Sequence, residues 1–437
     1  MVIVSVDDHV VEPPDMFEGH LSALYDGPRP ALVRTEDGRD VWKFGDDAQV
    51  GNIGLNAVVG RVKEEYGCEP VSYQQMRKNS WDLDGRIDDM NVNGIAACLN
   101  FPTIAGLDGN LFLQIKDRRH ALTLLRAYND WHMDELVARH PGRAIPMIIT
   151  PMWDVNEVVA EIKRNAAKGC HAITFSDNPT MRGLPSIHDA YWEPLWKACS
   201  DYQIIINIHI GSGNQAQYAS ALSPIEAWIT TMPISIVNSA ADWLNLQALH
   251  RYPDLKIFLS EGSIGWIPYF LERADFTNEQ HKAWTFSDFG AGKPSELFWK
   301  HFYTCFIEDR FGIRNLDVMN EDHVCYECDY PHSDTLWPES PEYLWSSVKD
   351  LSETRINKIT HQNALKAFQF DLFGKMGGRD SCTVGALRAK ATHVSTDRLS
   401  LSGDRPARGA QGPVTAEETM RVLGASVSNF KAETADA

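Results

Sequence analysis

Eight short apolar runs recur along the first three quarters of the chain, and segments with helical spacing separate them. Most runs are continuous in Val, Ile or Phe rather than alternating with polar residues, as expected for parallel strands covered on both faces. They lie at residues 2–6, 95–101, 144–150, 172–175, 204–210, 255–260, 302–306 and 323–327. The segments between them include 117–140, 154–169 and 190–202, which have the spacing of amphipathic helices. Strands that alternate with helices in this way predict an α/β protein with a (β/α)8 TIM-like barrel.

Two regions depart from this repeat. Residues 28–90 form an insertion after the first strand, where Asp37-Gly38 is typical of a hairpin turn, and we expect the hairpin to cover part of the barrel mouth. From residue 378 the composition shifts to Gly, Ala, Ser, Thr and Arg. We therefore predict a barrel over residues 1–377 and a largely disordered, low-complexity tail over 378–437, with at most one short helix at 415–426.

Charge and composition restrict the partners. The formal net charge of −18 disfavours nucleic acid, which binds basic surfaces. No apolar segment approaches the ~20 residues of a membrane-spanning helix, and the N-terminus lacks a signal-peptide pattern. The eight cysteines are scattered, several within apolar runs, as is typical of reduced intracellular proteins. We expect a cytoplasmic protein that acts on a small molecule.

Charged side chains end several of the apolar runs. The carboxyl ends of the strands carry the active site in barrels of this kind, so these residues should meet at one mouth. They are Asp7 and His9 at the first run, His209 at the fifth, Glu261 at the sixth, and Asp329 and His332 at the eighth. Side chains alternate along a strand, which places Asp7 and His9 on one face. Unpaired charges packed this closely are unfavourable unless a cation binds among them, and mixed imidazole and carboxylate donors suit zinc, iron or manganese.

Three motifs carry a resemblance to a known family. VDDHVVEPPDMF at 6–17, IHIGSG at 208–213 and DYPHSD at 329–334 occur in the order found in the amidohydrolase superfamily. The chain resembles its amidohydrolase-related branch, which includes aminocarboxymuconate semialdehyde decarboxylase and γ-resorcylate decarboxylase, over roughly residues 1–375. The resemblance implies that Asp7, His9, His209 and Asp329 take the metal-ligand places.

One departure from this pattern changes the expected chemistry. Where those decarboxylases have a histidine after the sixth strand, this chain has Glu261, whose two oxygens can bridge two ions. With Glu12 and His332 included, the candidate donors number seven, which is too many for one tetrahedral ion and suits two ions that share a carboxylate. Glu12 lies just beyond the first strand and could equally form a salt bridge at the barrel rim.

The seven-donor set resembles the dinuclear oxygenases of the same branch. This resemblance implies two divalent ions, iron or manganese with iron, and O2 and an electron donor as partners. The ligands would be Asp7, His9, His209, Glu261, Asp329 and His332, with Glu261 as the bridge. Our first hypothesis is therefore a dinuclear monooxygenase that hydroxylates a small, carboxylated molecule, with Glu261, Asp329 and His332 as catalytic groups.

Two other functions stay open. The first is a hydrolase or non-oxidative decarboxylase of a small carboxylated or cyclic compound, with one zinc or manganese ion and with Asp329 or Glu261 moving the proton. The second is a catalytically silent barrel that serves as a partner subunit. We also expect a homo-oligomer, because the apolar stretch 223–249 is longer than one covering helix needs.

Overall fold

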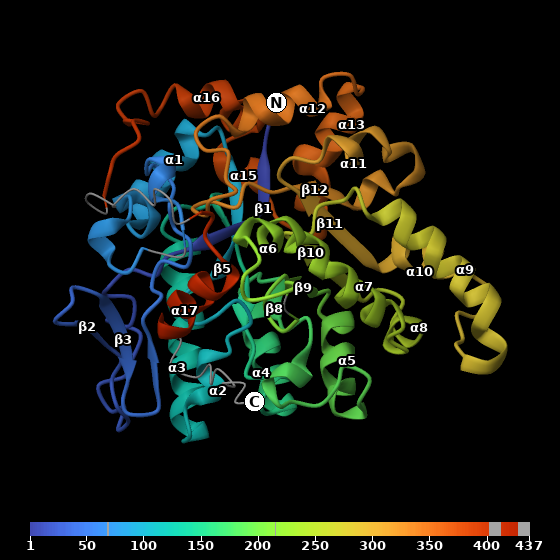
Figure 1. The fold of residues 1–437 in the computed structure, drawn as a ribbon, viewed down its shortest axis with the longest axis horizontal. Coiled ribbons are helices and arrows are strands. Elements are labelled where there is room, and N and C mark those ends of the chain that lie inside the picture. The colour runs from blue at the N-terminus through green and yellow to red at the C-terminus, as the bar shows by residue number, and fades with distance from the viewer. Residues whose placement is uncertain (68–69, 215, 402–411, 427–437) are drawn as a thin grey trace.

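A parallel barrel forms the body of the protein in the computed structural model, which describes residues 1–67, 70–214, 216–401 and 412–426 (Figure 1). Its strands are β1 (Val4–Val10), β5 (Ala97–Pro102), β6 (Ala144–Ile145), β7 (Ile148–Ile149), β8 (Ala172–Phe175), β9 (Ile205–His209), β10 (Lys256–Ser260), β11 (Phe302–Phe306) and β12 (Val324–Tyr326). They pair in the orders β1-β5-β6 and β7-β8-β9-β10-β11-β12. Only two residues separate β6 from β7, so these two short strands occupy one position.

The barrel closes between its first and last strands. The amide of Asp329, just after β12, donates a hydrogen bond to the carbonyl oxygen of Asp7 in β1 (2.8 Å). The amide of His9 donates likewise to the carbonyl oxygen of Tyr330 (2.7 Å). These bonds complete eight strand positions, and the predicted (β/α)8 barrel is confirmed.

Helices surround the barrel, between successive strands and after the last strand. They are α1 (Leu83–Val92), α2 (Leu111–Gln114), α3 (Arg118–Trp131), α4 (Val155–Ala166), α5 (Glu193–Asp201), α6 (Ile225–Thr231), α7 (Ile236–Leu244), α8 (Ala248–Arg251), α9 (Ile267–Thr285), α10 (Pro294–His301), α11 (Arg310–Arg314), α12 (Ser340–Val348), α13 (Glu353–Asn357), α14 (Asn363–Ala367) and α15 (Leu372–Met376). The local causes are visible in α4: the Asp154 side chain caps its first turn, and Val158 and Ile162 bury its inner face.

A β-bulge in β1 determines which of its side chains point into the barrel. Relative to β5, strand β1 carries an irregularity between Ser5 and Asp8. Val4 and Val6 pack in one core cluster, and the hydroxyl of Ser5 donates to the Asp8 side chain (2.8 Å). Unbroken alternation from Val4 would put Asp8, not Asp7, on the same face as Val6. The bulge changes this phase, as bulges beside active sites commonly do.

The insertion contains the predicted hairpin. Strand β2 (Ala31–Arg34) pairs antiparallel with β3 (Asp40–Phe44), which pairs with β4 (Ala48–Val50). Gly38 turns the chain with φ of +83°. Farther along, the amide of Val59 donates to the carbonyl oxygen of Pro331 (3.1 Å), so the insertion contacts the loop that follows β12.

The chain stays packed on the barrel beyond the predicted boundary at residue 377. Helix α16 (Val384–Arg388) contacts α1, and the amide of Leu399 donates to the carbonyl oxygen of Gly60 (2.9 Å). Helix α17 (Ala416–Ser426) corresponds to the predicted short helix and lies beside α6 (Figure 1). Residues 402–411 and 427–437, to which the prediction of disorder also applied, lie outside the described residues.

None of the helices described is both long and apolar enough to span a membrane.

Candidate metal centre

The ends of four strands bring six of the predicted ligands together. These are Asp7 and His9 from β1, His209 from β9, Glu261 directly after β10, and Asp329 and His332 after β12. All six are shielded from solvent, and Glu261, with 14% of its side chain accessible, is the most exposed of them. The convergence that the sequence predicts is therefore present.

The distances among these donors suit a shared cation. The His9 Nε2 atom lies 3.5 Å from an Asp7 oxygen and 3.2 Å from an Asp329 oxygen. The His209 Nε2 atom lies 3.5 Å from the other Asp7 oxygen and 3.1 Å from Glu261 Oε2. Asp7, His9 and His209 thus offer one ligand atom each within 4.8 Å of one another, and a second such group combines His9 and Asp329 with His332.

Several of the candidate ligand atoms have no hydrogen-bond partner. Among the described residues, neither Asp7 oxygen and neither ring nitrogen of His9 has a hydrogen-bond partner, although both side chains are fully buried. The His209 Nδ1 atom lies 2.6 Å from the carbonyl oxygen of Ile210, which places the ring hydrogen on Nδ1 because a carbonyl only accepts. Nε2 therefore presents a lone pair to Asp7 and Glu261, as in a metal-ligating histidine held by a backbone carbonyl. These residues fit a divalent ion.

Electrostatics also favour a bound cation. Burial raises the pKa of Asp7 well above its ordinary value, and the nearby carboxylates of Glu327, Glu261 and Asp329 raise it further. Burial lowers the pKa of His9, and the neighbouring imidazoles of His332 and His209 lower it further. A divalent ion would stabilise the ionised carboxylate and the neutral imidazole together.

Two site residues have strained backbones. Glu261 and Asp329 adopt φ values of +59° and +54°, in the left-handed region that favours glycine. Each such residue costs about 1–3 kcal/mol, and residues of this kind concentrate at functional sites. The chain accepts this cost where the strands β10 and β12 turn their last carboxylates toward the histidines.

Glu12 lies elsewhere, and its prediction as a ligand or a rim salt bridge is wrong. Its Oε1 accepts hydrogen bonds from the amide of Thr103 (3.0 Å) and the hydroxyl of Tyr128 (2.8 Å). Its Oε2 accepts from the amide of Ile104 (3.0 Å). The side chain is fully buried, which raises its pKa to about 7 against these hydrogen bonds. Glu12 therefore fixes the loop after β5 to the end of β1.

The sequence interpretation missed Glu327 and Cys305. Glu327 directly follows β12, and Cys305 lies in the neighbouring strand β11 with its sulfur 2.6 Å from Glu327 Oε2. Both are buried, and with Asp7 they form a third group of potential ligands. A signal was available, because Glu327 precedes Asp329 by two residues and side chains at this spacing share a strand face.

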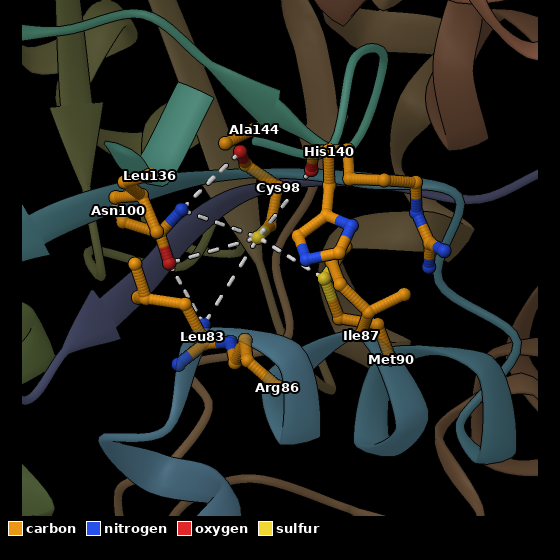
Figure 2. Close-up of a pocket in the computed structure, with 10 residues that line it drawn as sticks. Leu83, Arg86, Ile87, Met90, Cys98, Asn100, Leu136, His140 and Ala144 are labelled. Atoms are coloured by element: carbon orange, nitrogen blue, oxygen red, sulfur yellow. Dashed lines mark hydrogen bonds between the residues drawn. The ribbon is translucent and has the colours of Figure 1, made fainter. Parts of the chain in front are cut away.

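A separate small cavity lies between α1 and β5 (Figure 2). Its volume of ≈ 10 Å³ suffices for about one water molecule, so it cannot hold a substrate. Arg86 reaches from α1 toward Asn100 and Cys98, and it also pairs with the buried Asp8 (3.0 Å). Asp8, on the other face of β1 from Asp7, thus has a structural partner.

The comparisons with known proteins identify the family. The family model described as amidohydrolase matches residues 18–370, which is most of the chain. The chain belongs to the amidohydrolase family. The resemblance drawn from the three motifs is thereby confirmed. No curated protein sequence matches this amidohydrolase.

Solved structures share the fold of this amidohydrolase at low sequence identity. An amidohydrolase from Mycobacterium avium subsp. paratuberculosis K-10 is 18% identical and covers 84% of this chain and 99% of its own, with a TM-score of 0.62. The 5-carboxyvanillate decarboxylase of Novosphingobium aromaticivorans, complexed with manganese and 4-hydroxy-3-methoxy-5-nitrobenzoic acid, is 18% identical over 84% and 96%, with a TM-score of 0.58. The 2,6-dihydroxybenzoate decarboxylase from Rhizobium is 14% identical over 84% and 99%, with a TM-score of 0.57.

These structures correct the expected class of enzyme. The solved structures that this amidohydrolase resembles include decarboxylases, which are carboxy-lyases and not oxidoreductases. The preference for an oxidoreductase, a monooxygenase, over a carboxy-lyase is therefore wrong, and these structures give no support to iron, O2 or an electron donor. The presence of Glu261 and the donor count were insufficient grounds for it, since one of the seven donors, Glu12, is not at the site.

Proposed function

We propose that this amidohydrolase is a metal-dependent, non-oxidative decarboxylase of a small carboxylated aromatic or cyclic compound. The observation that carries the proposal is the buried set of Asp7, His9, His209 and Asp329, whose donors converge at the mouth of the barrel. Two similar structures are decarboxylases, and one of them holds manganese and a benzoic acid ligand. One manganese or zinc ion is the cofactor that this set suits.

The four residues divide the task of holding the ion. Asp7 and Asp329 supply anionic oxygens, and His9 and His209 supply neutral nitrogens, so the ion and its ligands carry little net charge. When bound, the ion acts as a Lewis acid that orients and polarises the oxygens of the substrate. His332, with Nδ1 2.9 Å from an Asp329 oxygen, keeps that carboxylate oriented.

Glu261 is the proton donor in this proposal. Decarboxylation adds a proton to the carbon that bears the carboxylate. The bond between this carbon and the carboxylate then breaks, the electron pair of that bond stays with the substrate, and CO2 leaves. The acid must face both the ion and the substrate. Glu261 lies 3.1 Å from His209 through one oxygen and is the most solvent-accessible member of the set.

The test is CO2 release under anaerobic conditions without a reductant. The protein, loaded with manganese or zinc, is incubated with a panel of carboxylated phenols that includes 5-carboxyvanillate and 2,6-dihydroxybenzoate. We expect CO2 release, a loss of about 10²–10⁴-fold in kcat for Glu261→Gln with its metal retained, and loss of metal for His209→Ala. The matched control is Glu308→Gln, an exposed glutamate just after β11, which should leave kcat unchanged.

Other outcomes would refute the proposal. Hydrolysis of amides or esters without CO2 release would favour the hydrolase. A strict requirement of CO2 release for O2 would exclude a non-oxidative decarboxylase. We also propose a cytoplasmic location, which the seven described cysteines support, since all are unpaired.

A further inference from the structure

The third group of potential ligands lies inside the barrel beside the metal centre. Asp7, Cys305 and Glu327 each offer one ligand atom within 4.8 Å of the others. They come from β1, from β11 and from the end of β12, which lies between those two strands, and at most 1% of each residue is exposed. Asp7 therefore belongs both to this group and to the group with His9 and His209.

The charges of this region exceed what one divalent ion balances. Four carboxylates, those of Asp7, Glu261, Glu327 and Asp329, lie together in or beside the barrel interior. Among the residues that the structure describes, no lysine or arginine forms an ion pair with any of the four. Both Asp7 oxygens lack a hydrogen-bond partner. One divalent ion leaves two negative charges that protons or a second cation must neutralise.

We propose that Asp7, Glu327 and Cys305 form a second cation subsite, for zinc or another divalent ion that accepts a thiolate. The subsite rests on the metal centre proposed above, with Asp7 shared between the two ions, but does not depend on decarboxylation. It differs from the arrangement expected from the sequence, where Glu261 was the bridge. Binding displaces the protons of the Cys305 thiol and the Glu327 carboxyl, because only the deprotonated groups are ligands.

Cobalt(II) tests this subsite directly. A Co²⁺–thiolate bond gives a charge-transfer absorption in the near ultraviolet that carboxylate and imidazole ligands do not give. Titration of the metal-free protein with Co²⁺ should give this band and about two ions per chain. Cys305→Ser should lose the band and retain one ion, and Glu327→Gln should weaken binding of the second ion. Cys325→Ser is the matched control, since Cys325 of β12 is buried beside Cys305 and belongs to none of the ligand groups.

The outcomes separate this inference from the proposed function. One Co²⁺ per chain without the band, or a band that survives Cys305→Ser, would overturn the subsite and leave the decarboxylase intact. Two ions and the band, with no CO2 release from any carboxylated compound, would support the subsite and count against the decarboxylase. Circular dichroism of each variant establishes that it is folded before its metal content is compared.

Discussion

Replacement of Glu12 distinguishes the structural role seen here from the ligand role that the sequence suggested. Glu12→Ala leaves three buried donors without an acceptor, namely the amides of Thr103 and Ile104 and the hydroxyl of Tyr128. Each buried donor left unsatisfied costs about 1–3 kcal/mol, and water entering the vacated space would recover part of this. We expect a loss of about 3–6 kcal/mol in the free energy of unfolding.

Glu12→Gln separates the charge of this residue from its hydrogen bonds. Burial raises the pKa of Glu12 from 4.5 to about 7, so the folded protein prefers the protonated carboxyl, which glutamine resembles. At pH 5 we expect the free energy of unfolding of this variant to fall by only about 1 kcal/mol. The reason is that only the side-chain NH2 group of the glutamine faces a hydrogen-bond donor instead of an acceptor. A raised pKa stabilises the fold fully below pH 4.5, and this contribution is lost as the pH rises through 7. Wild type should therefore lose about 3 kcal/mol relative to Glu12→Gln between pH 4.5 and 8.

The assay combines urea unfolding with metal analysis on the same samples. Both Glu12 variants should keep the metal content of the wild type, because the carboxylate contacts no member of the metal centre. The reasoning is refuted if Glu12→Ala loses metal while its unfolding midpoint is unchanged, which is what a ligand would show. It is equally refuted if the stability difference between wild type and Glu12→Gln does not change with pH.

Three further predictions concern other parts of the barrel. Arg86→Met should lower the free energy of unfolding by about 3–5 kcal/mol in urea, because it leaves Asp8 charged and buried without its partner. A loss below about 1 kcal/mol would mean that water replaces the guanidinium. Removal of metal by a chelator should lower the melting temperature, since an ion at a thousand times its Kd adds about 4 kcal/mol, and calorimetry with and without manganese measures this. Gly109→Ala should destabilise by roughly 2–4 kcal/mol, because φ is +79° and a Cβ atom would meet the side chain of Ile149; wild-type stability would show that the loop relaxes freely.

The barrel could be predicted from the sequence because its signal is repeated. Each apolar run is ambiguous alone, but eight of them with helices between leave few alternatives. The site residues followed from the same regularity, since the ends of parallel strands meet at one mouth. Alternation placed Asp7 and His9 on one face of β1, but alternation from Val4 and Val6 alone would have turned Asp8 into the barrel instead. A bulge between Ser5 and Asp8 decides which of the two neighbouring aspartates faces the histidines, and Asp8 on the other side pairs with Arg86 of α1, a partner that no local pattern specifies.

Glu12 and Glu327 show where this kind of inference holds and where it fails. Glu327 directly follows β12 and precedes Asp329 by two residues, and the strand expected over 323–327 would have placed it on the same face as its predicted neighbour at the centre, so it should have been included. Glu12 lies beyond Val10, where β1 ends, and its direction is set by the amides of Thr103 and Ile104, about ninety residues away. A carboxylate within the strand alternation can be assigned to a face from sequence. Position past a strand end is not sufficient, because Asp329, three residues beyond β12, reaches the centre, whereas Glu12, two residues beyond β1, does not. The tertiary contacts of each carboxylate decide its direction.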